Sequence, residues 1–472
     1  MVIRTFFSKS NTIIKKTPFN LGLYPVVMLN YGLTTSRVLL YFNVDDLKKQ
    51  IDEQGIQLEK YTHTLKMFNC GSINPSLFNK PIESTDKNGL KLRASSFDLI
   101  FMKINKPWDQ GVGFDDSYNF WISDNDSSIS MQGSNWYNSK TGIKWENEGV
   151  YSDTIIKEEI DKYDKGEKSL VIGIQHFDHG NEHISINLTD YINSLINGTE
   201  LNRGIMVLFS PHLELNPNTT VTKYVGFFNE KTNTFFQPLI ESKCNETISD
   251  DRYNFYLGRE NRLYLYTNED GFPTDLDNLP ICEIDGANYP VTHQMKGVYY
   301  ANVKLNRDDY SPDMIVSDIW SNISYHGEVS DDVENDFTIN TMDNPLNAHF
   351  KPMQAHQMSV SVNGISDNEK VVQGQIKEVS VEFKRPYYRE IIYPSRETYY
   401  RLYIEDCGKE IDIIDWDGVN VCYEYNYFVI NTNELLPHKY FIDIKTKYGR
   451  ETKLFKKQIE FEVVNNLEKM KI

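Results

Sequence analysis

The stretch from residue 169 to residue 211, SLVIGIQHFDHGNEHISINLTDYINSLINGTELNRGIMVLFSP, constrains the fold more than any other part of the chain. Residues 184–188 alternate between apolar and polar side chains, which predicts a half-buried strand. Asp190 stands where a helix N-cap is expected, and the apolar spacing after it predicts a short helix that ends at Gly198. Residues 205–209 alternate again and predict a returning strand. A strand, a short helix and a second strand therefore follow one another within forty-odd residues.

The whole chain is expected to be mostly β. At 472 residues it exceeds one hydrophobic core, and its 30 Tyr and 25 Phe favour strands. Residues 97–104, FDLIFMKI, are apolar on both faces, which predicts a strand inside a sheet. The expected architecture is an N-terminal jelly-roll-like β-sandwich followed by two small immunoglobulin-like (Ig-like) β-sandwich domains. The predicted parts are an arm at 1–30, a large sandwich at 31–282, and Ig-like domains at 283–372 and 373–472.

The last hundred residues repeat a strand–turn pattern that is typical of an Ig-like fold. Residues 436–448 are expected to enter the last hairpin, with Tyr440 making a corner contact to the backbone just before it. Residues 448–450, Tyr-Gly-Arg, are the predicted hairpin tip.

The charge of the chain argues against nucleic-acid binding. A formal net charge of −18 would repel phosphate over most of the surface. Six basic residues near the C-terminus favour a solvated strand edge, with a partner-binding patch as the alternative. They are Lys445, Lys447, Arg450, Lys453, Lys456 and Lys457.

The five cysteines indicate no disulfide framework, because they are sparse and never form a C-x-x-C pair. A reducing compartment is therefore expected. The first residues, MVIRTFFSKSNTIIKK, have no signal-peptide pattern, and no later segment has the length and hydropathy of a membrane span. These features favour a protein that is made and used in the cytoplasm.

One motif resembles a metal site. His179, Glu182 and His183 fit the H-x-x-E-H pattern of inverted zincins, with His176 and Asp178 close by. Such a site needs both histidines on one continuous helix. The Gly-Asn dipeptide between them favours a turn instead. We interpret the segment as a loop with incidental histidines and assign no catalytic, cofactor-binding or metal-ligating residue, although a loop-type metal site at these five residues stays open.

Trp108, Trp136 and Trp145 lie in a loop-rich region and admit two interpretations. Exposed indoles could stack on sugars, whereas tryptophans at loop–strand junctions more often close the end of a sandwich core. The core interpretation is favoured. No nucleophile elbow, Walker loop or dinucleotide fingerprint occurs, and paired acids such as Asp115-Asp116 are expected by chance in an acidic chain. Three classes remain: a structural protein, a carbohydrate- or receptor-binding module, and a hydrolase.

The opening stretch resembles the β-sandwich modules of secreted and surface repeat proteins that are called DNRLRE-type domains. In those domains a strand ends in D-(V/L)-T-x-x-(V/I), a helical turn follows, and N-x-G precedes the last strands. ISINLTDYI and LNRGIMVLF match this order, although Asn187 stands where those domains usually have Asp. SRVLLYF before a short helix, P-W-x-x-G-x-G and N-W-x-x-x-T-G-x-x-W match as well. The resemblance implies a β-sandwich for the first large domain.

About the first 280 residues are also similar to large tail-region proteins of bacteriophages, in particular the ring-forming tail proteins of crAss-like podoviruses. The similarity runs from SRVLLYF through FDLIFMKINKPWDQGVGFD and FDHGNEHISINLTDYIN to NRLYLY. It implies a non-enzymatic virion protein whose identical copies form a cyclic ring next to portal and other tail proteins, assembled in the host cytoplasm. A ring subunit buries large interfaces with its neighbours. Residues 1–30, 71–92 and 340–357 are therefore expected to gain order against another chain.

Overall fold

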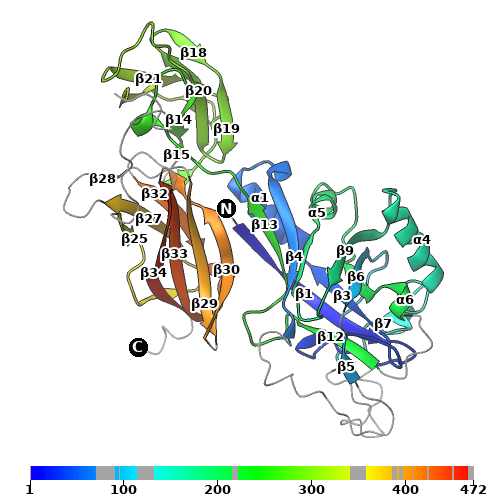
Figure 1. The fold of residues 1–472 in the computed structure, drawn as a ribbon. Coiled ribbons are helices and arrows are strands. Elements are labelled where there is room, and N and C mark those ends of the chain that lie inside the picture. Colours follow the sequence, from blue (N-terminus) through cyan, green and yellow to red (C-terminus); the bar gives the residue numbers. More distant parts are fainter. Residues whose placement is uncertain are drawn as a thin grey trace. The chain divides into compact units, whose positions relative to one another are not determined.

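The protein is mostly β, as the sequence predicts (Figure 1). The computed structural model describes residues 2–70, 91–94, 96–113, 132–214, 222–269, 271–340, 358–384, 391–392, 397–406, 408–421, 425–448 and 451–465. Nearly all of the predicted contact stretches at 71–92 and 340–357, and two residues of the predicted hairpin tip at 448–450, lie outside the described residues.

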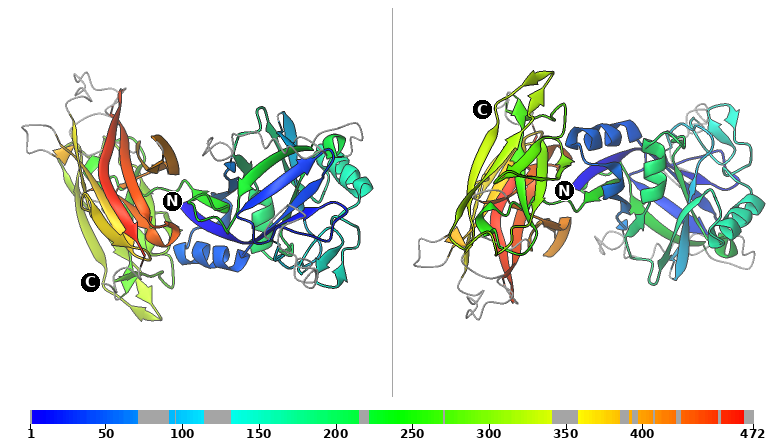
Figure 2. Two further views of the ribbon diagram at one scale, coloured as in Figure 1. Left: turned by 90° about the horizontal axis from the view of Figure 1, so that it is seen from below. Right: turned by 90° about the horizontal axis from the view of Figure 1, so that it is seen from above.

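The chain divides into two compact units. The N-terminal unit has residues 3–50 and 61–243, and the C-terminal unit has residues 1–2, 51–60 and 244–472. Figure 2 shows the strands of each unit from two further directions. Each unit is built around its own sheets, so each is described by itself.

The N-terminal unit contains an eight-stranded sheet in the order β10-β4-β13-β1-β3-β11-β6-β9 and a three-stranded sheet in the order β2-β12-β5. The large sheet has β1 (Val2–Ile14), β3 (Ser36–Phe42), β4 (Tyr61–Met67), β6 (Phe97–Lys103), β9 (Val171–Phe177), β10 (Ile184–Asn187), β11 (Ile205–Phe209) and β13 (Leu239–Cys244). The small sheet has β2 (Val26–Tyr31), β5 (Lys91–Arg93) and β12 (Thr222–Phe228). The other elements are α1 (Val44–Gln54), α4 (Asp153–Asp164), α5 (Thr189–Ile196), α6 (Pro211–Glu214) and the β7 (Asn138–Lys140)–β8 (Ile143–Lys144) hairpin.

The predicted N-terminal arm is wrong. Residues 2–14 form β1, which lies inside the large sheet between β13 and β3. Distant loops hydrogen-bond to its buried polar residues: the Asn11 side-chain amide donates to the Ser134 carbonyl, and the Ser10 backbone N–H donates to the Glu230 carboxylate. The arm therefore packs on its own chain.

The middle of the large sheet is covered on both faces. Strand β11 has five buried residues, and Met206 and Leu208 face a core that includes Trp136. The opposite face meets aromatic side chains, with Phe209 4.7 Å from Tyr31 of β2 between ring centroids. The prediction that residues 97–104 form an inner strand is confirmed, because β6 lies between β11 and β9.

A glutamine side chain joins the two ends of the large sheet. The Gln175 amide nitrogen in β9 donates to the His183 carbonyl at 2.8 Å, and the Ser185 N–H in β10 donates to the Gln175 side-chain oxygen at 2.8 Å. These are the two bonds that a neighbouring strand would make with its backbone. The sheet is thus barrel-like, and the Gln175 amide group joins its two end strands, β9 and β10. We call this junction the seam.

The opening stretch folds nearly as predicted, as β10, α5 and β11. Gly198, with φ +70°, follows the helix as expected. The predicted cap is wrong: helix α5 begins at Thr189, and Asp190 lies within its first turn. The Asn187 side chain accepts the Thr189 N–H at 2.9 Å and orders the entry into the helix.

A buried arginine fixes helices α4 and α6 against the sheet. Arg37 of β3 forms a bidentate pair with Glu214 of α6 at 2.9 and 3.1 Å. It also donates to the carbonyls of Gly149 and Tyr151, just before α4. The Ser152 side chain then caps α4 by accepting the Ile155 N–H.

The C-terminal unit begins with a sandwich of a three-stranded sheet, β14-β20-β19, and a four-stranded sheet, β18-β17-β21-β24. We call it the middle sandwich. Its strands are β14 (Asn261–Tyr266), β17 (Ile281–Ile284), β18 (Ala287–Tyr289), β19 (Val291–Met295), β20 (Val298–Val303), β21 (Ile315–Ser321) and β24 (Val333–Thr338). Two small hairpins accompany it: β15 (Asn268–Glu269)–β16 (Phe272–Pro273) and β22 (Ser324–Tyr325)–β23 (Glu328–Val329).

The first domain boundary lies near residue 244 and not near residue 282. Strand β14 pairs with β20 over its whole length, so residues 261–266 belong to the middle sandwich. A buried ion cluster supports this assignment, since Arg252 contacts both Asp250 and Asp318 at 2.6 Å. Residues 271–280 contain β16 and the loop that leads into β17 of that sandwich.

The last sandwich has two five-stranded sheets. One has β25 (Ser359–Asn363), β27 (Ile376–Lys384), β28 (Ile391–Ile392), β31 (Asn420–Val421) and β32 (Asn426–Asn431). The other, ordered β26-β34-β33-β29-β30, has β26 (Glu369–Val372), β29 (Thr398–Asp406), β30 (Lys409–Gly418), β33 (His438–Tyr448) and β34 (Glu451–Val464). The predicted corner contact is confirmed, because the Tyr440 hydroxyl donates to the Leu436 carbonyl at 2.8 Å.

Candidate functional site

The H-x-x-E-H segment is a turn between β9 and β10, as the Gly-Asn dipeptide indicates. Gly180 has φ +71°, which suits glycine. The Glu182 carboxylate accepts the N–H groups of His179 at 2.7 Å and Asn181 at 2.9 Å. Burial would raise the pKa of Glu182, but these backbone hydrogen bonds lower it below its ordinary value. The carboxylate therefore holds the turn and is not poised as a base.

The histidine side chains of this segment have separate partners and do not meet at a common metal-binding point. His183 accepts the Asn69 N–H at 3.0 Å, and burial lowers its pKa. His176 contacts Asp98 at 2.7 Å and Asp178 at 3.4 Å, and the hydrogen bond with Asp98 raises its pKa. Within the described ranges, no group of three or more His, Cys, Asp or Glu side chains is arranged to hold a metal ion.

A groove of about 550 Å³ lies between α4 and the edge of the large sheet, and Asp98 is one of the residues that line it. The helix contributes Lys157, Ile160, Asp161 and Asp164, which the 3.6-residue repeat places on one face. The sheet contributes Asp98 and Ile100 of β6 and Ile174 of β9, and Ser210 and His212 lie at the start of α6. The groove thus has an apolar floor and a mainly acidic rim.

The Ser210–His212 pair at the end of the groove is structural. The Ser210 hydroxyl lies 3.0 Å from His212 Nδ1, while the Ser210 carbonyl accepts the N–H groups of Leu213 and Glu214 and so starts α6. An activated serine needs a base that a third group orients. Asp98 also lines the groove, but it is engaged by His176. The groove is therefore arranged for binding rather than for nucleophilic chemistry.

The three loop tryptophans belong to the core, as the favoured interpretation has it. Trp108, Trp136 and Trp145 are 4%, 3% and 6% exposed. Trp108 donates to the Arg203 carbonyl at 2.9 Å and Trp145 to the Asn135 carbonyl at 2.8 Å, which satisfies both indoles. A sugar-stacking platform built from these residues is ruled out by their burial.

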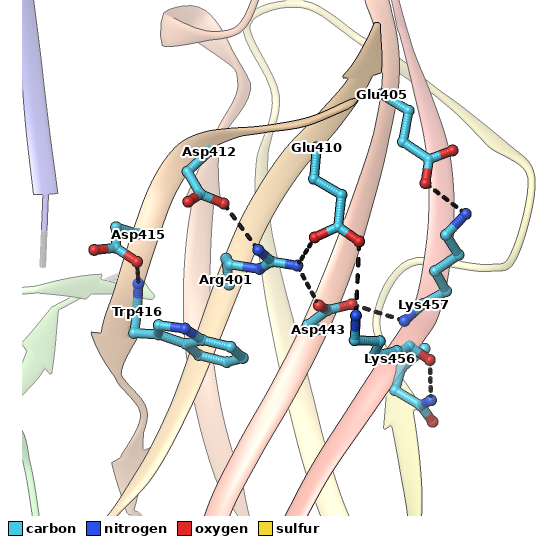
Figure 3. Close-up of polar contacts among 10 residues, drawn as sticks. Arg401, Glu405, Glu410, Asp412, Asp415, Trp416, Asp443, Lys456 and Lys457 are labelled. Carbon is cyan, nitrogen blue, oxygen red and sulfur yellow. Dashed lines mark hydrogen bonds and ion pairs between the residues drawn. The ribbon is translucent and has the colours of Figure 1, made fainter. Parts of the chain in front are cut away.

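The outer face of the last sandwich carries an ionic cluster around Arg401 (Figure 3). Arg401 contacts Glu410 and Asp443 at 2.6 Å and Asp412 at 3.2 Å. The Lys457 N–H also donates to the buried Asp443 at 2.8 Å. Three carboxylates therefore share one guanidinium on a face that is otherwise solvated.

The basic residues near the C-terminus lie on this face and its margins. The strand-edge interpretation is wrong for Lys445 and Lys447, because β33 is an inner strand of its sheet. It holds for Lys453, Lys456 and Lys457, because β26 pairs with β34 only at residues 461–464 and, among the described strands, only β33 pairs with the part of β34 before them. Lys457 contacts Glu405 at 2.6 Å, Lys447 contacts Glu397 at 2.9 Å, and Lys445 lies 4.2 Å from the Trp416 ring centroid. Acidic and aromatic neighbours thus compensate most of the positive charge. Arg450 lies outside the described residues.

A second candidate contact surface lies at one end of the middle sandwich. Three exposed apolar residues lie next to residues 321–324: Ile281 pairs with Ser321, the Asn322 side-chain amide donates to the Leu279 carbonyl, and Val329 pairs with Ser324. Phe272 lies on a hairpin that the Glu269–His326 contact of 3.3 Å joins to the same end. Val329, Phe272 and Leu279 are 82%, 73% and 55% exposed. We call Phe272, Leu279, Ile281 and Val329 the apolar patch.

The sequence alone does not predict the groove beside α4 or the apolar patch. The i, i+4 and i+7 spacing of Lys157, Asp161 and Asp164 marks one helix face, but the groove also needs β6 and β9 from elsewhere in the chain. The apolar patch combines side chains from four separate strands or loops. Spacing within one element cannot indicate which other element it meets.

Comparisons with known proteins give structural matches only. No family model and no curated protein matches the sequence. A chimeric titin Z1Z2 tandem matches at 12% identity and a TM-score of 0.14, covering 45% of this chain and 93% of that chain. Fibronectin(III)-like modules of Clostridium thermocellum CbhA match at 7% identity and a TM-score of 0.15, covering 46% and 91%.

A third match is a putative membrane-anchored protein from Corynebacterium diphtheriae, at 9% identity and a TM-score of 0.16, covering 98% of this chain and 97% of that chain. Such low similarity supports no shared function. In the described part of the chain, no helix has both the length and the apolar character needed to cross a membrane. The fold and the two surfaces define a multi-domain β-sandwich protein.

Proposed function

We propose that this protein is a non-enzymatic structural subunit of a bacteriophage virion. In this proposal, identical copies form a cyclic ring in the tail, next to portal or other tail proteins, and assemble in the host cytoplasm. The similarity of the first 280 residues to ring-forming tail proteins of crAss-like podoviruses suggests this role. The observation that carries it is the apolar patch on the middle sandwich.

The apolar patch has the character of a protein contact. Scattered apolar side chains are normal on a surface, but a contiguous group of them is typical of an interface. Covering a side chain such as Phe272 with a partner would contribute about 25 cal/mol per Å² of apolar surface removed from water. A subunit that is held by neighbours in a ring would gain this stabilisation at every contact.

The rim of the patch indicates how copies would meet. Glu328, Asp331, Asp332 and Glu334 are exposed around it. Two identical acidic rims would repel each other if the patch met itself. The contact is therefore heterologous, between the patch and a different, less acidic surface of the next copy, and contacts of this kind generate rings when the rotation closes.

Electron microscopy of the purified full-length protein tests this proposal. We expect class averages with cyclic symmetry at micromolar concentration. Val329→Asp adds a charge at the most exposed residue of the patch and should reduce the rings to single subunits. Particles that remain single subunits for the wild-type protein across the concentration range would contradict the proposal.

A carbohydrate- or receptor-binding module is the second candidate. Burial of the three loop tryptophans removes its original support, but Trp416 on the Arg401 face offers an aromatic side chain next to several carboxylates. Carboxylates and an indole are the groups that often hold a sugar ring. A glycan array in which binding appears and is lost in Trp416→Ala would favour this candidate over the ring.

A further inference from the structure

The groove beside α4 contains charges that the protein itself leaves uncompensated. Among the described residues, no ion pair or hydrogen bond engages the side chains of Lys157, Asp161 or Asp164. Two other charges of the same helix are used internally: Glu159 binds Lys162 at 2.5 Å and accepts the Leu170 N–H. Among the described residues of α4, the three charges that line the groove lack an ion pair, as does Glu158 outside it.

The floor of the groove is aliphatic. Ile100 of β6, Ile174 of β9 and Ile160 of α4 come from three elements and form one apolar surface beneath the acidic rim. A ligand that covers this floor needs an aliphatic stem, and a ligand that compensates Asp161 and Asp164 needs a cationic end. An anion would be repelled, and a neutral sugar would satisfy neither requirement.

We propose that this groove binds a lysine side chain of a partner polypeptide. The four-carbon stem lies on the isoleucine floor, and the ammonium group lies beside Asp161 and Asp164. A stem of this kind buries its methylene groups while its charged end stays at the rim. Asp98 contributes less, because His176 already engages it at 2.7 Å.

Lys157 explains why the ligand is part of a polypeptide and not a free diamine. It precedes Asp164 by seven residues, which is roughly 10 Å along the helix axis. The backbone carbonyl of a bound lysine residue can accept a hydrogen bond from Lys157 while its ammonium meets the aspartates. The second ammonium of a diamine would instead meet Lys157 and be repelled.

Methyl NMR of the full-length chain, labelled at isoleucine δ1 positions, tests the proposal directly. Ile100, Ile160 and Ile174 are the reporters, assigned through Ile→Val variants. The probes are N-acetyl-lysine methylamide, N-acetyl-norleucine methylamide, which has the stem without the charge, and 1,5-diaminopentane. We expect the lysine probe to shift all three methyl signals and the other two probes to shift them at least about fivefold less at equal concentration.

Two variants complete the test. The double variant Asp161→Asn and Asp164→Asn should weaken binding of the lysine probe by about tenfold, because it removes two partly exposed ion pairs. Glu158→Gln makes the same kind of change on an exposed residue of α4 outside the groove and should leave binding unchanged. The proposal is overturned if the lysine probe shifts none of the three methyl signals at 20 mM. It is also overturned if the norleucine probe binds equally, or if both variants behave alike.

Discussion

His63 is a buried side chain whose pKa differs between the folded and the unfolded protein. It is fully buried in β4, with Nδ1 2.7 Å from the Ser242 hydroxyl. Burial lowers its pKa to about 4, and Asn193, which lies beside the ring, acts in the opposite direction. The folded protein therefore keeps the ring neutral at pH values where the unfolded chain, with an ordinary pKa of 6.5, already binds a proton.

This difference in pKa makes the N-terminal unit less stable in acid. Because the unfolded state binds more protons between pH 6.5 and 4, the free energy of unfolding falls as the pH drops through that window. The full loss is up to about 3 kcal/mol at 1.36 kcal/mol per pKa unit. Urea unfolding at pH 7, 6, 5 and 4 measures it, and His63→Gln should show a shallower decline. Equal slopes for both proteins would contradict the role of His63.

Arg37 and Glu214 form a buried pair whose separation should be costly. Arg37→Met leaves Glu214, whose side chain is 2% exposed, without its main cation. We expect a loss of about 3–5 kcal/mol in the free energy of unfolding. The double variant Arg37→Met with Glu214→Met removes both charges and should recover part of that loss. Denaturant unfolding of the two variants measures the difference, and a double variant less stable than the single one would refute this account.

At the scale of residues, local rules predicted some side chains and missed others. Tyr440 and the three loop tryptophans behave as their positions in the sequence indicate. Arg37 could not be recognised, because its partner Glu214 is 177 residues away. A buried arginine is understandable only when the acceptors around it are known.

At the scale of elements, the seam of the large sheet depends on one side chain. Gln175→Ala removes both hydrogen bonds between β9 and β10, so we expect a loss of about 1–3 kcal/mol and faster hydrogen exchange at the Ser185 amide. Gln175→Glu keeps an acceptor for that amide and serves as the matched control. If Ser185 exchanges equally fast in the wild type and in both variants, the seam is not closed by Gln175.

Apolar periodicity in the sequence predicts some of the strands and helices and misses others. Strand β10, helix α5 and strand β11 follow directly from apolar periodicity. Apolar periodicity does not predict strand β1, because Ser10, Asn11 and Thr12 are buried although they are polar. Loops more than a hundred residues away hydrogen-bond to the Ser10 backbone N–H and the Asn11 side chain, and no pattern within β1 could indicate that.

At the scale of the whole molecule, the sequence predicts the fold class and two C-terminal sandwiches but misplaces both boundaries between sandwiches. The predicted boundary at 372/373 is wrong, because β25 and β26 pair with β27 and β34 of the last sandwich. Residues 244–282 were assigned to the first domain because strand-like segments continue without a break. The pairing of β14 with β20 moves them to the middle sandwich. The groove and the apolar patch arise only from such tertiary contacts, which is why neither was predicted.

Sedimentation velocity over a range of protein concentrations tests most directly whether the patch joins subunits of an assembly. The account predicts that the wild-type protein sediments as a defined oligomer and that Val329→Asp sediments as a single subunit. Leu201→Asp, at a leucine outside the patch that is 73% exposed against 82% for Val329, should sediment as the wild type does. A wild-type protein that remains a single subunit at every concentration, or three proteins that sediment alike, would contradict it.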